Sequence, residues 1–504
     1  MIAAAERPLA LEAAVHSPPA PSPAAPLRWA RVFSFPVMQA CGLVLLVFLT
    51  CRSRFHDPDT WWHLKVGQMI WESRSLPAAD TLSYTTGNHA WIPHEWLAEI
   101  SMYAAWNFGG PRLLWLWMAV IASLLVVVVY TLCALSSGNA KVALLGGLMT
   151  WFFGTTGLAI RPLVLGHLFL AIELLVLHLA RGRCRWLWTL PPLFAVWVNC
   201  HGSYALGLAV LGLALLISFL DVRAGRIFSS RWSVRGRVAL ALVFALCVAA
   251  LFVNPVGAKL VTYPLDLLTQ QPDNVGNVTE WAPLDVHQVR GAAALAIAAV
   301  VALLALARPV ALPLEETLLF ALGFAMAFRH TRMLFVFGIL GAPLLCRLLA
   351  GAWRVYDVGR DRRAPNAVLM ALAAALIAIS VPGETGLRQQ ELRNNPTGAI
   401  DFIRRAGLSG HMLNEYLWGG YLIWALPEQK VFIDGRADVF AWTGVLAAYG
   451  RWYTLQDDPK MLLDQHGVDY CLLRKEAPLS QVLPYLPGWK KLYGDEMSVV
   501  FGRQ

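Results

Sequence analysis

Residues 55–70 read FHDPDTWWHLKVGQMI and follow an apolar run at 37–51 that predicts most of a membrane span. Asp57 and Asp59 therefore lie where the chain would leave the membrane. Two carboxylates two residues apart can share a cation or act as a general base. They can also simply cap the short helix that TWWHLKVGQMI predicts. This pattern alone does not separate capping from chemistry.

The composition is that of a membrane protein. Hydrophobic residues make up 57% of the 504 residues and charged residues only 14%, whereas a soluble domain carries about 25% charged residues. The net charge of +9 comes mostly from arginines in loops, which fits the orientation of membrane spans better than nucleic-acid binding. The eight cysteines show no spacing typical of a zinc site or a disulfide framework.

The apolar segments predict a polytopic α-helical membrane protein with about eleven spans. They lie at 36–53, 112–134, 142–160, 162–180, 186–200, 203–220, 238–254, 292–307, 315–328, 333–350 and 366–382. Basic residues concentrate in alternate loops, such as RGRCR (181–185) and VRAGRIFSSRWSVRGR (222–237). The positive-inside rule then predicts a cytoplasmic N-terminus and places 54–111, 254–290 and the chain after Pro382 outside, as in a bacterial inner-membrane protein.

Three parts of the chain differ in composition. Residues 1–27, rich in Ala and Pro, are predicted to be a disordered cytoplasmic N-terminus, and 28–383 to be the transmembrane module. Residues 384–504 are predicted to form an extracytoplasmic α/β domain. In this tail, helix-like PTGAIDFIRRAG (396–407) and DDPKMLLDQHG (457–467) alternate with strand-like KVFIDG (430–435), VDYCLLR (468–474) and MSVVFG (497–502).

Two further polar clusters lie in the outside segments. QQPDNVGNVTEWAPLD (270–285) contains Glu280, and FRHTR (328–332) forms a turn between two spans with Arg329, His330 and Arg332. Arginines near a membrane usually have a partner, and phosphate suits them because a guanidinium binds it bidentately. Arg161, in GLAIRPLVLG, is a similar residue, but taken alone it is better explained by snorkelling.

Other polar residues near the predicted spans have simpler explanations. Glu95 and Glu99 lie one helical turn apart in HEWLAE and predict a solvated helix face. Asn199 and His201, in NCHGSYALG, are interpreted as a hydrogen-bonded packing pair at the end of a span.

DTWWHLKVGQMI, with Pro77 and Asp80 downstream, resembles the first outside loop of oligosaccharyltransferase catalytic subunits, especially the archaeal ones. The matching residues are Asp59, Trp61, Trp62, His63, Leu64 and Lys65. NVTE (277–280) is similar to the family's Ser-Val-x-Glu loop, with Asn277 in place of Ser. NEYLWGGYLIWALPEQKVFIDGRADVF (414–440) resembles the region of its Trp-Trp-Asp-Tyr-Gly motif. The chain thus resembles the GT-C superfamily of glycosyltransferases, which use sugars on lipid phosphates.

This resemblance, together with the outside clusters, predicts the site residues. The predicted catalytic residues are Asp59, Asp57 and Glu280, which would also hold Mn²⁺ or Mg²⁺ if the reaction needs a metal. The predicted donor-phosphate ligands are Arg329, His330, Arg332, Arg161 and Lys65, and the predicted acceptor-side residues are Tyr416, Trp418, Tyr421, Asp434 and Arg436.

The chain departs from the family pattern in two places. The family's second acidic motif is absent, because the corresponding loop reads TTGLAIRPLV, so a metal-independent mechanism stays open beside a metal-dependent one. Trp-Trp-Asp is also absent, since Leu417, Trp418 and Gly419 occupy that region. Recognition of an Asn-x-Ser/Thr acceptor is therefore not expected.

The predicted function is that of an inverting glycosyltransferase. It would move a sugar from a polyprenyl phosphate or diphosphate to an extracytoplasmic acceptor, with membrane lipid, donor and acceptor as partners and no nucleic acid. An enzyme like an O-antigen ligase or polymerase would share the donor but would not need the Asp59 cluster. The sequence also leaves open a transporter, for which Glu173 inside a span is the main indication, and a non-catalytic envelope-assembly protein.

Overall fold

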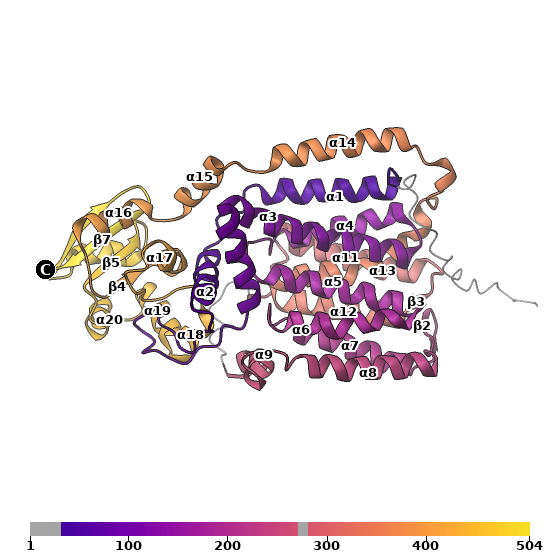
Figure 1. Cartoon of the computed structure of the whole chain (residues 1–504), viewed down its shortest axis with the longest axis horizontal. Coiled ribbons are helices and arrows are strands. Elements are labelled where there is room, and N and C mark those ends of the chain that lie inside the picture. Colours follow the sequence, from indigo (N-terminus) through magenta and orange to yellow (C-terminus); the bar gives the residue numbers. More distant parts are fainter. Residues whose placement is uncertain (1–31, 271–280) are drawn as a thin grey trace, which may run out of the picture.

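The computed structural model describes residues 32–270 and 281–504. Every one of the predicted apolar segments falls on a helix, and these helices lie side by side in one bundle (Figure 1). They are α1 (Phe35–Cys51), α3 (Trp96–Ser137), α4 (Ala140–Gly154), α5 (Leu163–Ala180), α6 (Leu190–Trp197), α7 (Tyr204–Ser218), α8 (Val234–Ala250), α11 (Val289–Ala307), α12 (Leu314–Arg329), α13 (Leu334–Leu349) and α14 (Arg363–Ser380).

The helices differ in whether they could cross a membrane alone. Five helical segments of the described chain are long and apolar enough: Trp96–Ser137, Leu163–Ala180, Val289–Ala307, Thr331–Ala352 and Arg363–Ser380. By contrast, α6 has 8 residues and follows a 3-10 turn, η2 (Cys184–Thr189), which is short against the roughly 20 residues that a span needs. The polytopic helical class is therefore confirmed, while the number of spans stays a prediction.

Burial separates central helices from peripheral ones. In the segment that contains α13, 78% of the most apolar window is buried, against 17% for α11 and for α14. α13 therefore forms the centre of the bundle, and α11 and α14 present apolar side chains outward, as expected of helices that face lipid.

The two ends of the bundle carry different structures (Figure 1). At one end lie α2 (Asp59–Ser73), α9 (Ala258–Gln270) and the C-terminal region. At the other lies a three-stranded sheet of β1 (Val222–Ala224), β2 (Ile227–Ser229) and β3 (Leu312–Pro313). This sheet belongs to loops predicted to be cytoplasmic, whereas the first end gathers the segments predicted to lie outside.

The long helix α3 is two helices in one. Gly109 and Gly110 leave the helical conformation, Gly110 with a φ of 59°, and Pro111 follows. A positive φ is tolerated best by glycine, and proline can begin the next helix but not continue the previous one. The residues before the kink therefore belong to the outer end of the molecule.

The C-terminal region is an α/β structure, as predicted. Its sheet has the order β4-β5-β7-β6, with β4 parallel to β5 and the other pairs antiparallel. The strands are β4 (Met412–Asn414), β5 (Tyr470–Arg474), β6 (Trp489–Gly494) and β7 (Ser498–Arg503). The helices are α15 (Glu384–Asn394), α16 (Thr397–Ala406), α17 (Gly419–Ala425), α18 (Ala437–Trp442), α19 (Val445–Tyr453), α20 (Pro459–Gln465) and α21 (Pro478–Val482).

One strand prediction is wrong. KVFIDG (430–435) adds no strand to this sheet; instead Val431 forms an isolated bridge with Ser83 of the first outside loop. The backbone of Val431 donates to Leu82 and accepts from Tyr84. The run is apolar because it is buried between that loop and the C-terminal sheet.

The buried apolar side chains form one continuous cluster from the bundle into the C-terminal region. At the junction, Trp61 of α2 meets Tyr421 of α17, with ring centroids 5.0 Å apart. Gly420 approaches the α2 start so closely that a Cβ there would lie 2.6 Å from the carbonyl oxygen of Pro58. The domain boundary at residue 384 therefore stays a prediction, because the buried apolar cluster continues across it.

Candidate functional site

The loop acids lie at the start of α2, at the end of the bundle that faces the C-terminal region (Figure 1). Asp57 Oδ1 accepts from the backbone N–H of Asp59 at 2.9 Å, as a capping residue does. It also accepts from Arg161 Nε at 2.8 Å, and Arg161 Nη1 lies 2.9 Å from Asp59 Oδ2. Asp57 therefore bonds both the backbone at the start of α2 and Arg161, while its catalytic role stays a prediction. Arg161 is an ion-pair partner rather than a snorkelling side chain.

This group of three side chains, which we call the open triad (Asp57, Asp59 and Arg161), remains in contact with solvent. The exposed side-chain fractions are 13%, 19% and 24%. A charged ligand could therefore reach the triad and replace one of its contacts, because a partly exposed ion pair contributes little to stability.

The C-terminal region contributes to the surroundings of Asp59. A Cβ on Gly435 would collide with Asp59 Oδ1, so glycine permits this close approach. The Tyr416 hydroxyl is close enough that Asp59 adds to the rise in the pKa of Tyr416, whose main cause is burial. Tyr416 is thus the predicted acceptor-side residue that the structure brings to the open triad.

The other predicted acceptor-side residues are buried. Arg436 donates to Asp80 Oδ1 at 2.7 Å and to Asp434 Oδ2 at 2.6 Å, and all three side chains have no exposed surface. We call Asp80, Asp434 and Arg436 the closed triad. Its carboxylates come from the first outside loop and the C-terminal region, so this group joins the two.

Trp418 and Tyr421 are likewise buried, with exposed fractions of 1% and 3%. The Tyr421 hydroxyl donates to Glu391 at 2.8 Å, and the Trp418 indole donates to the carbonyl of Asn394 at 3.2 Å. Direct contact of Trp418, Tyr421, Asp434 or Arg436 with an acceptor is therefore not supported, because each side chain is enclosed by the junction that it stabilises.

The FRHTR turn lies against Trp281. The Arg332 guanidinium stacks 4.3 Å from the centre of the Trp281 ring, and His330 Nδ1 lies 2.7 Å from the Trp281 carbonyl oxygen. Arg329, in the last turn of α12, is exposed. Burial raises the pKa of the Glu95 carboxyl, and the charges of Arg332 and Arg161 act against this larger effect.

Two predicted site residues are not brought to this place. Lys65 lies on α2, where its ammonium donates to Gln68 Oε1 at 3.1 Å, one turn along the same helix. Glu280, and with it NVTE (277–280), lies outside the described residues.

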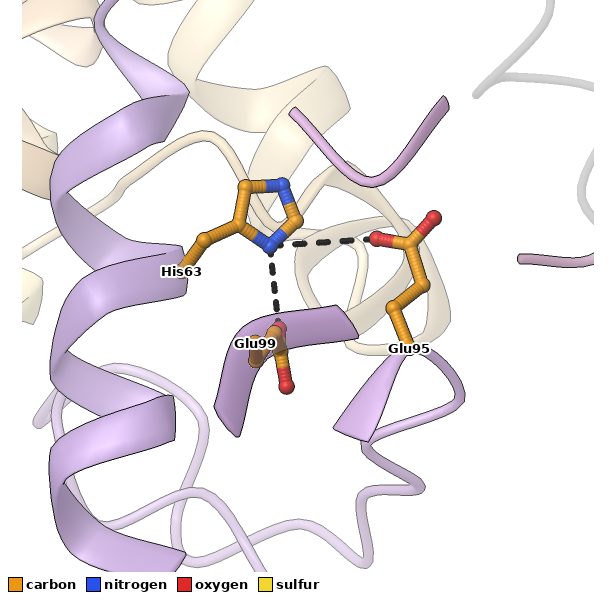
Figure 2. Close-up of side chains that lie close together, drawn as sticks. All are labelled: His63, Glu95 and Glu99. Carbon is orange, nitrogen blue, oxygen red and sulfur yellow. Dashed lines mark hydrogen bonds and ion pairs between the residues drawn. The ribbon is translucent and has the colours of Figure 1, made fainter. Parts of the chain in front are cut away.

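His63, Glu95 and Glu99 form a group that the sequence did not reveal (Figure 2). His63 Nδ1 is 2.9 Å from Glu99 Oε1 and 3.8 Å from Glu95 Oε2. Both glutamates are buried, with exposed fractions of 8% for Glu95 and 1% for Glu99, so the predicted solvated face is wrong. Burial lowers the pKa of His63 well below its usual range, and Arg161 lowers it further.

Close packing of two helices creates this group. A Cβ on Gly67 of α2 would collide with the backbone carbonyl of Glu99, so the glycine lets α2 lie directly on the outer part of α3. His63 is one turn before Gly67 and points to the same neighbour. The spacing of Glu95 and Glu99 was visible in the sequence, but their covering by α2 is a tertiary effect.

Asn199 and His201 have separate roles in the structure. The Asn199 side chain accepts from the Trp96 indole at 2.7 Å and donates to the carbonyl of Val253 at 2.8 Å, as expected of a packing residue. His201 Nε2 lies 3.4 Å from Glu95 Oε1. His201 therefore belongs to the surroundings of the His63 group rather than to a pair with Asn199.

A cavity of about 520 Å³ opens at the same end of the molecule. It lies between the first outside loop, α9 and α18, and its walls include Trp91, Tyr263, Asp266, Asp438 and Trp442. The Tyr263 hydroxyl donates to Asp438, and its ring lies 4.5 Å from that of His94. Aromatic faces beside carboxylates are suited to a polar ligand with apolar faces, such as a sugar.

Comparisons with known proteins found similarity to solved structures only. No family model matches the chain, and no curated protein matches it. The structure of the Archaeoglobus fulgidus oligosaccharyltransferase tethered to an acceptor peptide with the NVT sequon has a TM-score of 0.55 and 12% identity, over 87% of this chain and 69% of that one. That of AglB from Archaeoglobus fulgidus, with an inhibitory peptide and a dolichol-phosphate, has a TM-score of 0.51, 12% identity and the same coverage.

A third structure, ArnT from Cupriavidus metallidurans bound to undecaprenyl phosphate, has a TM-score of 0.49 and 12% identity, over 92% of this chain and 97% of that one. Of these three structures, the two archaeal ones have TM-scores above 0.5, and at 12% identity they indicate a shared fold rather than a shared reaction. The fold of the chain is therefore similar to that of the archaeal oligosaccharyltransferases, the proteins whose first outside loop its own loop resembles in sequence.

Proposed function

We propose that this protein is an inverting glycosyltransferase that moves a sugar from a polyprenyl phosphate or diphosphate to an extracytoplasmic acceptor. The observation that carries the proposal is the open triad, in which two partly exposed carboxylates share one arginine at the end of a bundle of apolar helices. Carboxylates suit an acceptor hydroxyl and arginines suit a phosphate, so both partners of such a reaction find complementary groups here.

In the proposed reaction, an acceptor oxygen attacks the anomeric carbon of the donor sugar. The new carbon–oxygen bond forms as the bond to the carrier phosphate breaks, and the proton of the acceptor passes to a carboxylate. Asp59 orients the acceptor and accepts the proton, with Asp57 as its neighbour. Because Arg161 already contacts both acids, it holds the two carboxylates in place with charge-assisted hydrogen bonds.

The carrier phosphate gains negative charge as it leaves. Arg332 and His330, with Arg329 at the surface of the same turn, would neutralise that charge, which is usually the larger part of the stabilisation in such reactions. Lys65 is removed from this proposed set, because its ammonium lies with Gln68.

A metal ion at the loop acids fits the described residues poorly. The guanidinium of Arg161 lies against both Asp57 and Asp59 and supplies the positive charge that an ion would bring. A divalent ion would have to displace it or bind beside it, against charge repulsion. In the proposed reaction, Arg161 therefore takes the place of a metal at Asp57 and Asp59.

The acceptor is proposed to occupy the cavity of about 520 Å³ at the same end of the molecule. Trp91 and Trp442 would offer faces for a sugar ring, and Asp266 and Asp438 would accept its hydroxyl hydrogen bonds. We also propose that this end of the molecule is extracytoplasmic and that the basic loops are cytoplasmic, because of the charge pattern of the loops. The protein would then lie in the inner membrane of a bacterium.

The test is a turnover assay with the full chain reconstituted in lipid. A panel of radiolabelled polyprenyl-phosphate and polyprenyl-diphosphate sugars would be offered, and release of the free lipid carrier would be measured with and without EDTA. One donor should be consumed, and consumption should fall in Arg332→Gln but not in Arg360→Gln, which changes an exposed arginine before α14. Consumption of no donor, or equal effects of the two substitutions, would overturn the proposal.

One observation favours a second candidate, a transporter. Glu173 of α5 is fully buried, and neither of its carboxylate oxygens has a hydrogen-bond partner among the described residues. An ionisable side chain inside a membrane helix often marks an ion or proton path. Solute-driven proton uptake into proteoliposomes that is lost in Glu173→Gln, without any donor consumption, would favour this candidate over the transferase.

A further inference from the structure

The group of His63, Glu95 and Glu99 has the dimensions of a metal site. One ligand atom from each residue lies within 4.8 Å of the others, and the separations from His63 Nδ1 are 2.9 and 3.8 Å. In a tetrahedral site with bonds of about 2.0 to 2.1 Å, neighbouring ligand atoms are about 3.3 Å apart. The two separations from His63 bracket that value, and the ligand atoms of the two glutamates lie within 4.8 Å of each other, so an ion between the three would draw the carboxylates together.

An unsatisfied polar atom points to a missing partner in this group. Glu99 is 1% exposed, and its Oε2 atom is buried without a hydrogen-bond partner among the described residues. Burying a carboxylate oxygen without a partner is costly. His63 contacts only the other oxygen, Oε1, so a cation bound to this carboxylate would offset part of the cost of burying it.

The surroundings orient Glu95 toward the same point. His201 Nδ1 accepts from the backbone N–H of Ser203 at 3.0 Å, so in the neutral ring the proton lies on Nε2. That nitrogen lies 3.4 Å from Glu95 Oε1, while Glu95 Oε2 is directed at His63. His201 therefore acts as an outer partner that fixes a ligand carboxylate, an arrangement common around metal sites.

We propose that His63 Nδ1, Glu95 and Glu99 bind one divalent transition-metal ion, of which zinc is the best fit, with water in the fourth position. One imidazole and two carboxylates form a ligand set that Zn²⁺ accepts in tetrahedral geometry. Mg²⁺ fits less well, because it prefers oxygen ligands and retains several waters. This site shares no ligand with the loop acids, so it differs from a metal at Asp57, Asp59 and Glu280.

The ion would position the loop acids rather than take part in the reaction. His63 lies four residues after Asp59 on α2, and Glu95 and Glu99 lie at the start of α3. Residues four apart on a helix share one face, so an ion at His63 would pin the face of α2 that carries Asp59. The ion would thereby fix the open triad relative to the bundle.

The test measures binding directly and does not depend on turnover. The full chain, purified in detergent and stripped with EDTA, is dialysed against Zn²⁺ or Co²⁺, and bound metal is measured by elemental analysis. Wild type should hold about one ion per chain, and the Co²⁺ form should show the intense visible absorption of tetrahedral coordination. His63→Ala and Glu99→Gln should each lose the ion, whereas Glu72→Gln, which changes an exposed residue of α2, should keep it.

Glu95→Gln provides a second loss variant if His63→Ala does not fold. Wild-type protein without bound metal, or metal retained in all three ligand variants, would overturn the proposal. Turnover by a protein that binds no metal in this assay would contradict the metal site and leave the transferase proposal standing, while bound metal without any turnover would do the reverse.

Discussion

The open triad and the closed triad have the same composition, two aspartates and one arginine, but opposite surroundings. In the open triad the three side chains keep 13 to 24% of their surface exposed. In the closed triad all three have none. Each joins segments far apart in the chain, because Arg161 follows α4 and Arg436 precedes α18.

The comparison indicates that burial, and not residue type, distinguishes a group that a ligand can reach from a group that only stabilises the fold. Breaking a fully buried ion pair leaves an uncompensated charge and costs about 3–5 kcal/mol. A partly exposed pair contributes only about 0–1 kcal/mol. The open triad can therefore exchange Arg161 for a substrate without loss of the fold, whereas the closed triad cannot exchange its partners.

The largest expected effect is on stability, in the closed triad. Arg436→Gln should lower the free energy of unfolding by about 3–5 kcal/mol, since it leaves Asp80 and Asp434 buried without their counter-ion. Thermal unfolding of the purified protein in detergent measures this effect. Arg161→Gln is the matched control from the open triad and should cost under about 1 kcal/mol. Equal losses in the two variants would erase the distinction between the triads.

The next effect is on activity, in the open triad. Arg161→Gln should lower the rate of sugar transfer about 10- to 100-fold, the range expected for the loss of charge-assisted hydrogen bonds. Arg161→Lys keeps the charge but cannot bridge two carboxylates as a planar guanidinium does, so it should recover only part of the rate. Full activity in Arg161→Gln would show that the arginine serves packing alone.

A smaller effect should appear on acidification. Burial favours a higher pKa for Asp80, but Arg436 and hydrogen bonds outweigh it and lower the pKa below its usual value. This carboxylate therefore stabilises the fold above about pH 4, and its contribution is lost as the pH falls through the lowered pKa. Burial raises the pKa of Asp434, so the contribution of Asp434 to stability changes with pH in the opposite direction.

Comparing unfolding of wild type and Asp80→Asn across acidic pH isolates the contribution of Asp80, because Asp434 is present in both proteins. The stability difference between them should shrink as the pH falls below about 4. A difference that stays constant with pH would mean that the charge of Asp80 does not support the joint.

The smallest expected effect is at Lys65. Lys65→Ala should change neither the turnover rate nor the equilibrium constant of unfolding by more than about twofold, because the Lys65 ammonium bonds a side chain of its own helix, Gln68. A large loss of donor affinity in this variant would return Lys65 to the phosphate site.

Much of the fold could be predicted from the sequence, because long apolar runs impose helices whatever their neighbours are. The loop acids and Arg161 were each visible as unusual charges near a membrane. That one arginine serves both acids could not be predicted, since the contact crosses 104 residues of chain. Burial of Glu95 and Glu99 depends on Gly67 letting α2 lie on α3, and the apolar run at 430–435 is buried by another loop.

The measurement that tests the central claim most directly is the rate of sugar transfer per folded molecule in Asp59→Asn and Asp80→Asn. The two variants make the same chemical change, one in each triad. Asp59→Asn should lose about 10²- to 10⁴-fold in rate while its unfolding temperature is unchanged. Asp80→Asn should unfold earlier but keep its rate per folded molecule. An active Asp59→Asn, or a folded but inactive Asp80→Asn, would contradict the assignment of chemistry to the open triad and of support to the closed one.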